Sequence, residues 1–165
     1  ISVEDNKPYL LEYNCRMGDP ETQSLMMYLY KNDVDFLDLI GFDNSKYPDN
    51  FNLTFIDDKE FSGYCCTIVL AADGYPASPK KDFYIDLSGI DEKPSLKIFH
   101  AGTKISNGAV RVTGGRILSI NTCCDRKQDA IDLAYENIRK IKAYTDPKLE
   151  DENMSLIFFR TDIGS

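Results

Sequence analysis

The sequence predicts an α+β chain in which helices and strands are segregated rather than alternating. Three observations support this fold class. One strand and two short helices are indicated near the N-terminus, several short apolar segments separated by Gly, Pro and Asn turns follow, and one amphipathic helix precedes a last strand. We therefore expect two unequal pieces.

The first piece begins with a predicted strand over residues 9–14, where aromatic and aliphatic side chains give way to polar ones. A helix is expected next, extending to about Tyr30. Asp19 would cap it and Pro20 would occupy its first position, because a carboxylate accepts hydrogen bonds from the free amides there and proline has no amide hydrogen to satisfy. Glu21 suits the positive end of the helix dipole.

A second, shorter helix is predicted around Val34 and Leu37, and it should stop at Gly41. Residues 42–50 carry Asn, Ser, Pro and Asp with few aliphatic side chains. We place the boundary between the two pieces in this stretch.

The second piece is defined by its turns and its apolar periodicity. Asn107 and Gly108 predict a tight hairpin. Asp125 and Gln128 are spaced as a capping box for a helix over residues 125–143. The apolar stripe of that helix consists of Ile131, Ala134, Ile138 and Ile141, and strands are expected at residues 64–72, 97–103, 111–112, 116–122 and 156–159.

Composition limits the possible partners. The chain has 165 residues, with 19 Lys and Arg against 27 Asp and Glu, so its net charge is −8. Such a surface repels phosphate backbones and anionic lipids, and we expect no nucleic-acid and no membrane partner. No apolar run approaches the roughly 18 to 20 residues that cross a bilayer, and residues 1–5 lack the regions of a signal peptide. We therefore expect a cytoplasmic location.

The five cysteines fall as Cys15, Cys65-Cys66 and Cys123-Cys124. Neighbouring cysteines in a strand point to opposite faces, which disfavours zinc chelation or disulfide pairing between them. We expect reduced thiols that pack as small core residues.

Glu12, Asn14 and Arg16 are the candidate functional residues, since alternate positions of an extended chain share one face. A carboxylate and a carboxamide oxygen are hard ligands that suit partly hydrated Mg²⁺ bound to phosphate. Arg16 would add a positive fork for a phosphate or a developing acyl phosphate. The alternative is a solvent-facing strand with an ion pair between Glu12 and Arg16.

The next residues favour the functional interpretation. Gly18, Asp19, Pro20 and Glu21 place a tight turn and a helix N-terminus, with its free N–H groups, beside these side chains. A metal, a guanidinium and helix amides together predict a site for a polyanion.

The run PYLLEYNCRMGDPETQ at residues 8–23 closely resembles the end of the ATP-grasp region in the phosphoribosylamine–glycine ligase family, also called glycinamide ribonucleotide synthetases. The likeness continues in the family's order and spans nearly the whole chain. It includes VLAADGYP at residues 69–76, FHAGT at 99–103, GGRIL at 114–118 and RTDIG at 160–164.

The resemblance implies a purine-biosynthesis ligase that uses ATP to join glycine to phosphoribosylamine through a glycyl phosphate. It implies that Glu12 and Asn14 bind Mg²⁺ or Mn²⁺ and that Arg16 is the catalytic residue that stabilises the transferred phosphoryl group. Residues 18–21 would contribute to the pocket for glycine and phosphoribosylamine.

The resemblance also implies a finer fold. Residues 1–62 would be the last part of an ATP-grasp sheet with two helices, and residues 63–165 would form the family's C-terminal domain, a small mixed β-strand domain with one long helix. The family's N-terminal domain, adenine-binding lobe and upstream acidic metal ligand have no counterpart in this sequence, so we expect the chain alone to be inactive. It departs from the family pattern at Met17, Asp73 and Thr113.

Two other interpretations stay open: another ATP-grasp carboxylate–amine ligase, or a non-catalytic packing or interaction module. Among residues that look functional, His100 is expected to make a structural hydrogen bond. Arg160 and Asp162 are expected either to pair with each other or to anchor the terminal strand. An exposed sheet edge around residues 9–15 would favour a homodimer.

Overall fold

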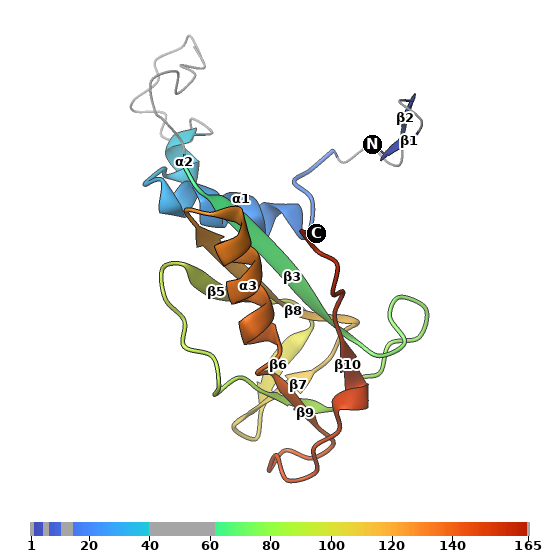
Figure 1. Cartoon of the computed structure of the whole chain (residues 1–165). Helices are drawn as coiled ribbons and strands as arrows, with labels where there is room; N and C mark the ends of the chain where they lie inside the picture. The colour runs from blue at the N-terminus through green and yellow to red at the C-terminus, as the bar shows by residue number, and fades with distance from the viewer. Residues whose placement is uncertain (1, 5–6, 11–14, 40–61, 165) are drawn as a thin grey trace.

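The computed structural model describes residues 2–4, 7–10, 15–39 and 62–164, and it combines antiparallel sheets with helices (Figure 1). No helix in these ranges is long and apolar enough to cross a membrane. The described helices are α1 (Glu21–Lys31), α2 (Phe36–Leu39) and α3 (Lys127–Ile138), with a 3-10 turn at Met154–Leu156. The described strands are β1 (Ser2–Glu4), β2 (Lys7–Tyr9), β3 (Tyr64–Ala72), β4 (Tyr84–Asp86), β5 (Leu96–His100), β6 (Thr103–Ser106), β7 (Ala109–Val112), β8 (Arg116–Cys124), β9 (Lys142–Tyr144) and β10 (Ile157–Phe158).

A four-stranded antiparallel sheet in the order β10-β3-β8-β5 forms the centre of the molecule. Its long strands β3 and β8 pair from Tyr64 opposite Cys124 to Leu70 opposite Leu118, where the register shifts. A second four-stranded antiparallel sheet has the order β6-β7-β4-β9, and β1 pairs with β2. The predicted α+β class is confirmed at this level.

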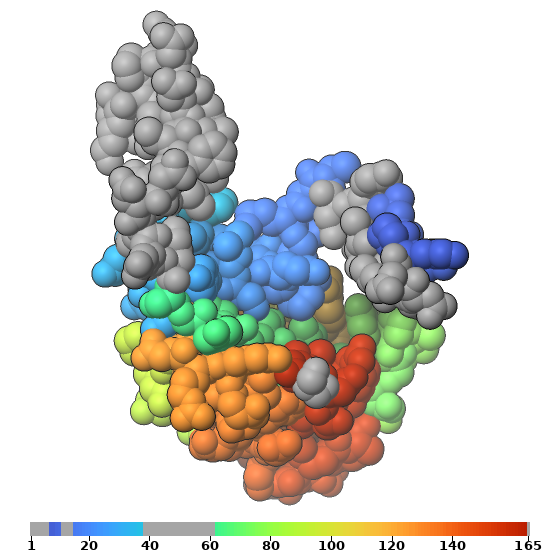
Figure 2. Space-filling view, turned by 45° about the horizontal axis from the view of Figure 1, so that its top comes forward, coloured from blue at the N-terminus to red at the C-terminus, as the bar shows by residue number. Residues whose placement is uncertain are grey.

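The two faces of the central sheet are covered by different helices. Ile68 of β3 is almost fully buried in the core that includes α3. Its neighbour Thr67 points the other way, and its hydroxyl lies 2.6 Å from the Ser24 hydroxyl of α1. Figure 2 shows α1 in blue on one side of the green β3 and α3 in orange on the other. The sheet therefore lies between a helix from each half of the chain.

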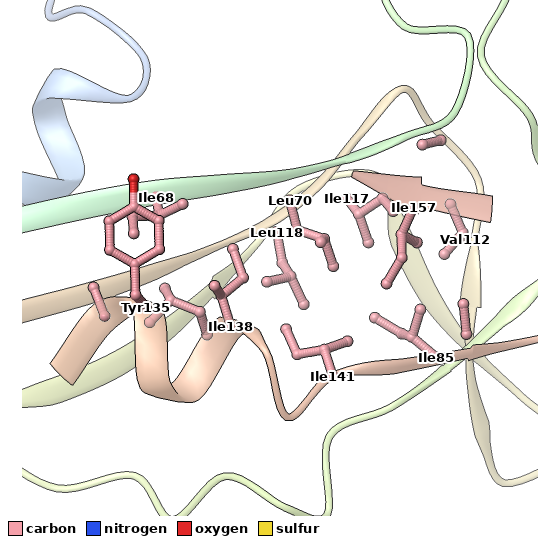
Figure 3. Close-up of a cluster of buried hydrophobic side chains, with 14 of the residues drawn as sticks. Ile68, Leu70, Ile85, Val112, Ile117, Leu118, Tyr135, Ile138, Ile141 and Ile157 are labelled. Carbon is pink, nitrogen blue, oxygen red and sulfur yellow. The ribbon is translucent and has the colours of Figure 1, made fainter. Parts of the chain in front are cut away.

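One apolar core joins the two sheets and α3 (Figure 3). Side chains of the central sheet, such as Leu70 and Leu118, meet Ile85 and Val112 of the second sheet and Ile138 of α3. Burial of such aliphatic side chains stabilises the fold by about 1.5–3 kcal/mol each. Further members of this core are Ile68, Ile117, Ile120, Ala134, Tyr135, Ile141 and Ile157.

Strand and hairpin predictions in the second half of the chain are largely confirmed. The expected strand at residues 64–72 coincides with β3, and the expected hairpin joins β6 to β7. Asn107 and Gly108 have φ angles of 56° and 78°, which residues of these types tolerate. Turn chemistry therefore identified the connection correctly.

The predicted N-cap of the first helix is wrong. Pro20 occupies the cap position and makes no side-chain cap hydrogen bond, so α1 begins at Glu21. The Asp19 Oδ1 atom instead accepts a hydrogen bond of 2.9 Å from Gln23 Nε2. A longer side chain one turn along has taken the acceptor that the amides would have used.

The predicted capping box of the long helix is also wrong. Arg126 is the N-cap residue and makes no side-chain cap hydrogen bond. Asp125 pairs with Lys31 of α1 at 2.6 Å, and Gln128 donates to Asp132 Oδ1 at 2.9 Å. Both predicted capping side chains therefore bind other side chains.

The same helix ends earlier than its apolar stripe suggests. The helix α3 ends at Ile138, and Ile141 is fully buried from the segment that follows it. The sequence did not reveal the short strand β9, which begins at Lys142, or β4, which pairs with it. Three-residue strands are too short to give a clear alternation of apolar and polar residues.

The strand predicted at residues 9–14 is confirmed only at its first residue. Tyr9 ends β2, and Leu10 lies outside a strand. Residues 11–14, and the predicted boundary at residues 42–50, lie outside the described residues.

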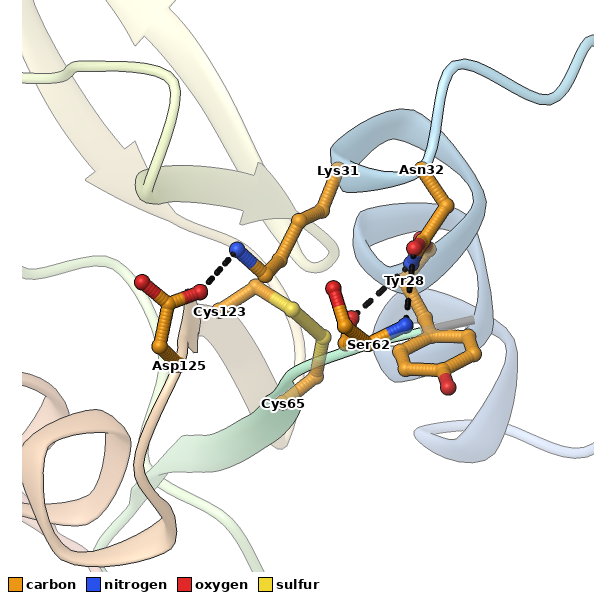
Figure 4. A network of polar contacts seen from close by, with 7 residues as sticks. All are labelled: Tyr28, Lys31, Asn32, Ser62, Cys65, Cys123 and Asp125. Carbon is orange, nitrogen blue, oxygen red and sulfur yellow. Dashed lines mark hydrogen bonds and ion pairs between the residues drawn. A yellow bond between two sulfur atoms is a disulfide. The ribbon is translucent and has the colours of Figure 1, made fainter. Parts of the chain in front are cut away.

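The prediction of five reduced cysteines is wrong. Cys65 of β3 and Cys123 of β8 form a disulfide, with their Cα atoms 4.1 Å apart (Figure 4). The two residues are direct partners in the antiparallel register. The prediction was based on cysteines that are neighbours in the sequence. In the sheet, one cysteine of the Cys65-Cys66 pair lies opposite one cysteine of the Cys123-Cys124 pair. The free cysteines are Cys15, Cys66 and Cys124.

Two glycines allow a close approach of backbone beside β8. A Cβ atom added to Gly102 would lie 2.6 Å from the Cα of Gly114 and 2.8 Å from the carbonyl oxygen of Arg116. Because backbone cannot give way as a flexible side chain does, Gly102→Ala is expected to lower the free energy of unfolding by about 1–3 kcal/mol.

Urea unfolding measures this effect. Gly89→Ala is the matched control, since its Cβ would lie at 3.4 Å from the Lys140 Cβ, and it should change stability by less than about 0.5 kcal/mol. Equal stability of the Gly102→Ala protein and the parent would contradict the expected clash.

Candidate functional site

Of the predicted metal ligands and the predicted catalytic arginine, the structure describes only the arginine. Glu12 and Asn14 lie outside the described residues. Arg16 lies in a bend, is exposed, and donates a hydrogen bond of 2.8 Å to the carbonyl oxygen of Met17. A guanidinium that is exposed and bonded only to its neighbour's carbonyl in the described part of the chain is accessible to an anionic ligand.

The turn at residues 18–21 leads directly into α1. The amide of Thr22 donates to the Gly18 carbonyl oxygen at 3.0 Å, and the Thr22 hydroxyl donates to the same oxygen. The side chain of Glu21 folds over Gly18, where a Cβ atom would meet its carboxylate. A Cβ atom at this position would meet the flexible side chain of Glu21 rather than backbone, so the Glu21 carboxylate would have to move aside.

Asp19 is held by Arg116, the first residue of β8 in the central sheet. The Arg116 guanidinium donates to the backbone carbonyl oxygen of Asp19 at 3.0 Å, and its second terminal nitrogen lies 3.0 Å from the Asp19 Oδ2 atom. The two residues are 97 positions apart in sequence. The fold therefore joins the first long motif to the GGRIL motif.

The other motifs of the resemblance gather around Arg116. The Gly102 amide donates to the Arg116 carbonyl oxygen at 2.9 Å, and the Ala72 amide donates to Gly115 at 2.8 Å. The Tyr75 ring covers Gly115, where a Cβ atom would lie 2.5 Å from the ring. Segments that are far apart in the sequence thus contact one another next to the start of α1.

Two adjoining cavities lie beneath the start of α1. One has a volume of about 370 Å³ and includes Glu21, Ser24 and Lys127. The other, about 290 Å³, is more apolar and has Arg116 and Arg160 among its lining residues. Both cavities include Pro20, Thr67 and Ile163.

Arg160 and His100 have the structural partners expected of them. Arg160 Nε donates to Asp162 Oδ1 at 2.8 Å, and a second guanidinium nitrogen binds the other carboxylate oxygen. This hydrogen bonding holds the pKa of Asp162 below its usual value. The His100 Nδ1 atom lies 2.8 Å from the Thr103 hydroxyl.

An ion pair joins α1 to the residues before α3 (Figure 4). The hydrogen bond from Lys31, together with its positive charge, lowers the pKa of Asp125. A carboxyl group whose pKa is lower in the folded than in the unfolded protein stabilises the fold above the unfolded value, about 3.9, and loses that contribution as the pH falls through the folded value.

We therefore expect Asp125→Asn to lower the melting temperature slightly at pH 6 and to lose this effect as the pH falls through the lowered pKa of Asp125. Thermal unfolding between pH 2 and pH 7 measures the difference. Asp91→Asn, a change at an exposed loop carboxyl, is the control. A difference that persisted at pH 2 would show that Asp125 acts by something other than its charge.

A comparison with known families identifies the family of the chain. The family model described as the C domain of phosphoribosylglycinamide synthetase matches residues 65–165. The chain belongs to the phosphoribosylglycinamide synthetase family. The resemblance stated from the sequence motifs is thereby confirmed.

Curated relatives of this synthetase family match along nearly the whole chain. The phosphoribosylamine–glycine ligase of Clostridium acetobutylicum is 38% identical over 156 residues, which are 94% of this chain and 32% of the relative. The ligase of Brucella melitensis is 34% identical over 99% of this chain and 34% of its own length. A bifunctional purine biosynthetic protein of Schizosaccharomyces pombe is 33% identical over 99% of this chain and 18% of its own length.

A solved structure of the same family supports the fold. The crystal structure of phosphoribosylamine–glycine ligase from Thermotoga maritima has a TM-score of 0.64 and 29% identity, and the match covers 92% of this chain and 33% of that chain. This chain thus spans about a third of the length of the bacterial ligases that it matches.

Only some of the residues predicted for the site lie in the part of the chain that the structure describes. Within the described residues, no group of three His, Cys, Asp or Glu side chains is placed to hold a metal ion. The expected ligands, Glu12 and Asn14, offer a carboxylate and a carboxamide, a donor set that fits Mg²⁺ or Mn²⁺. Arg116 was missed as a partner of Asp19, and its place in a family motif was the only signal available.

Proposed function

We propose that this chain forms the C-terminal part of a phosphoribosylamine–glycine ligase. The observation that carries the proposal is the family match at residues 65–165, together with 38% identity to the Clostridium acetobutylicum ligase along 94% of the chain. In this assignment residues 1–62 are the last part of the ATP-grasp domain and residues 63–165 are the C-terminal domain. The protein that contains them would act in the cytoplasm.

The proposed reaction joins glycine to phosphoribosylamine at the expense of ATP. The γ-phosphoryl group passes to the glycine carboxylate, and the amine of phosphoribosylamine then attacks the glycyl phosphate carbonyl. The products are glycinamide ribonucleotide, ADP and phosphate. Such a reaction depends on holding the carboxylate, the phosphoryl group and the amine in line, so positioning carries much of the catalysis.

Residues of the first motif have separate roles in this proposal. Glu12 and Asn14 would hold Mg²⁺ or Mn²⁺, which when bound shields the phosphate oxygens from the incoming carboxylate. Arg16, exposed in its bend, would stabilise the negative charge of the transferred phosphoryl group. The turn at residues 18–21 would contribute to the pocket for glycine and phosphoribosylamine, beside the cavities beneath α1.

The test is glycine-dependent release of ADP. A full-length ligase carrying these residues is expected to release ADP only when glycine and phosphoribosylamine are both present, whereas the 165-residue chain alone should release none. ADP release by the full-length protein with a different acid or amine, and none with glycine, would overturn the assignment. A homodimer through residues 9–15 stays a prediction, which light scattering tests.

A further inference from the structure

Arg116 makes two contacts with Asp19 in the turn at residues 18–21. Together these contacts restrain both the main chain and the side chain of Asp19. One terminal nitrogen binds the backbone carbonyl of Asp19 and the other its carboxylate, each at 3.0 Å. We propose that Arg116 is a positioning residue that fixes the turn at residues 18–21 against the central sheet and so shapes the pocket for glycine and phosphoribosylamine. The inference rests on the proposed function of that turn.

The guanidinium is suited to this task by its shape. Its planar fork presents two donors at a fixed separation, so that it restrains the main chain and the side chain of Asp19 together. A lysine ammonium at the same place would keep the positive charge but lose the fixed fork. The contact therefore specifies the geometry of the turn as well as its charge.

The backbone of Arg116 is itself held in place by the central sheet and by the Gly102 segment. Arg116 is the first residue of β8, and its carbonyl oxygen accepts the Gly102 amide at 2.9 Å. The close approach of Gly102 to Gly114 fixes the segment just before it. A guanidinium that extends from backbone held in this way can hold a turn that has less support of its own.

The turn depends on this outside support. Within the described residues, the other hydrogen bonds of Gly18 and Asp19 go to Thr22 and Gln23, which are parts of the same turn and helix start. The next link from α1 to the sheet is the contact between Ser24 and Thr67. Loss of the Arg116 contact would therefore free the turn while leaving α1 docked.

Because the Arg116–Asp19 pair is partly exposed, its effect on the order of the turn can be measured separately from its effect on the stability of the fold. The side chains of Arg116 and Asp19 are 39% and 46% exposed, and ion pairs in such positions contribute little to the free energy of unfolding. Removing the guanidinium should therefore change the order of the turn far more than the stability of the fold.

The first experiment measures amide hydrogen exchange in the 165-residue chain. Exchange at Thr22, whose amide bonds Gly18, is expected to be about tenfold faster in Arg116→Gln than in the parent, with amides of β8 unchanged. Arg116→Lys should be intermediate. Arg111→Gln, which removes the pair between Arg111 of the second sheet and Asp82, is the matched control and should leave Thr22 exchange unchanged.

The second experiment uses the full-length ligase. Arg116→Gln is expected to raise the KM for phosphoribosylamine or glycine about tenfold, with the KM for ATP and kcat within about twofold of the parent. Arg111→Gln should leave all three constants unchanged. A fall in kcat with unchanged KM values would overturn the positioning role.

The two experiments fail in distinguishable ways. Unchanged Thr22 exchange in Arg116→Gln, or the same increase in Arg111→Gln, would overturn the inference whatever the ligase does. A parent ligase with no glycine-dependent ADP release would overturn the proposed function, and with it the substrate pocket, while the exchange data would still report on the anchor itself.

Discussion

Replacing Glu12 by alanine in the full-length ligase is expected to lower kcat by roughly a thousandfold or more and to leave the protein folded. The proposed role is the reason, because a metal shell that loses its only carboxylate from this segment binds the ion weakly and leaves phosphate charge unshielded during transfer. ADP release at saturating glycine, phosphoribosylamine and ATP measures the effect.

Three controls make the result specific. Glu12→Gln should be impaired almost as much, since it keeps the shape but removes the charge. Glu150→Ala removes an exposed carboxylate in a distant loop and should retain parental activity. Circular dichroism should give the same melting temperature for all of these proteins. Near-normal turnover of Glu12→Ala would remove the metal role from the proposal.

Reduction of the disulfide is expected to lower the free energy of unfolding by about 2–4 kcal/mol. Cys65 and Cys123 close a loop with a sequence separation of 58, and opening it returns conformational freedom to the unfolded chain. Urea unfolding with and without dithiothreitol measures the difference. The variant with both cysteines replaced by alanine should resemble the reduced parent and should not respond to dithiothreitol.

Thiol counting gives an independent check. The unfolded, unreduced protein should react at Cys15, Cys66 and Cys124, and all five cysteines should react after reduction. In the folded protein Cys66 should react slowly, because burial raises the pKa of its thiol and leaves less thiolate. Five reactive thiols before reduction would contradict the disulfide.

Much of the second half of the fold could be predicted because its signals are local. The apolar, β-branched segment of β3 and the Asn107-Gly108 turn act through neighbouring residues. The helix-cap and helix-end predictions failed where tertiary contacts, and not neighbouring residues, decided the structure. Asp125 has the spacing of a cap, but Lys31 binds it. Ile141 fits the helical stripe, yet it is buried after the helix has ended.

The candidate site was predictable in composition but not in assembly. The chemistry of Glu12, Asn14 and Arg16 follows from their residue types. The contact between Arg116 and Asp19, like the pairing of Cys65 with Cys123, depends on which strands adjoin, and no local pattern encodes that choice.

The placement of α1 affects how this protein can be shortened. The family match begins at residue 65, but Met27 and Leu29 of α1 are buried, and Ser24 meets Thr67 on the sheet. A truncated version that began at residue 65 would expose one face of β3 and β8 to water and would tend to aggregate. A minimal autonomous unit must therefore start ahead of Gly18 and retain the helix as part of its own interior.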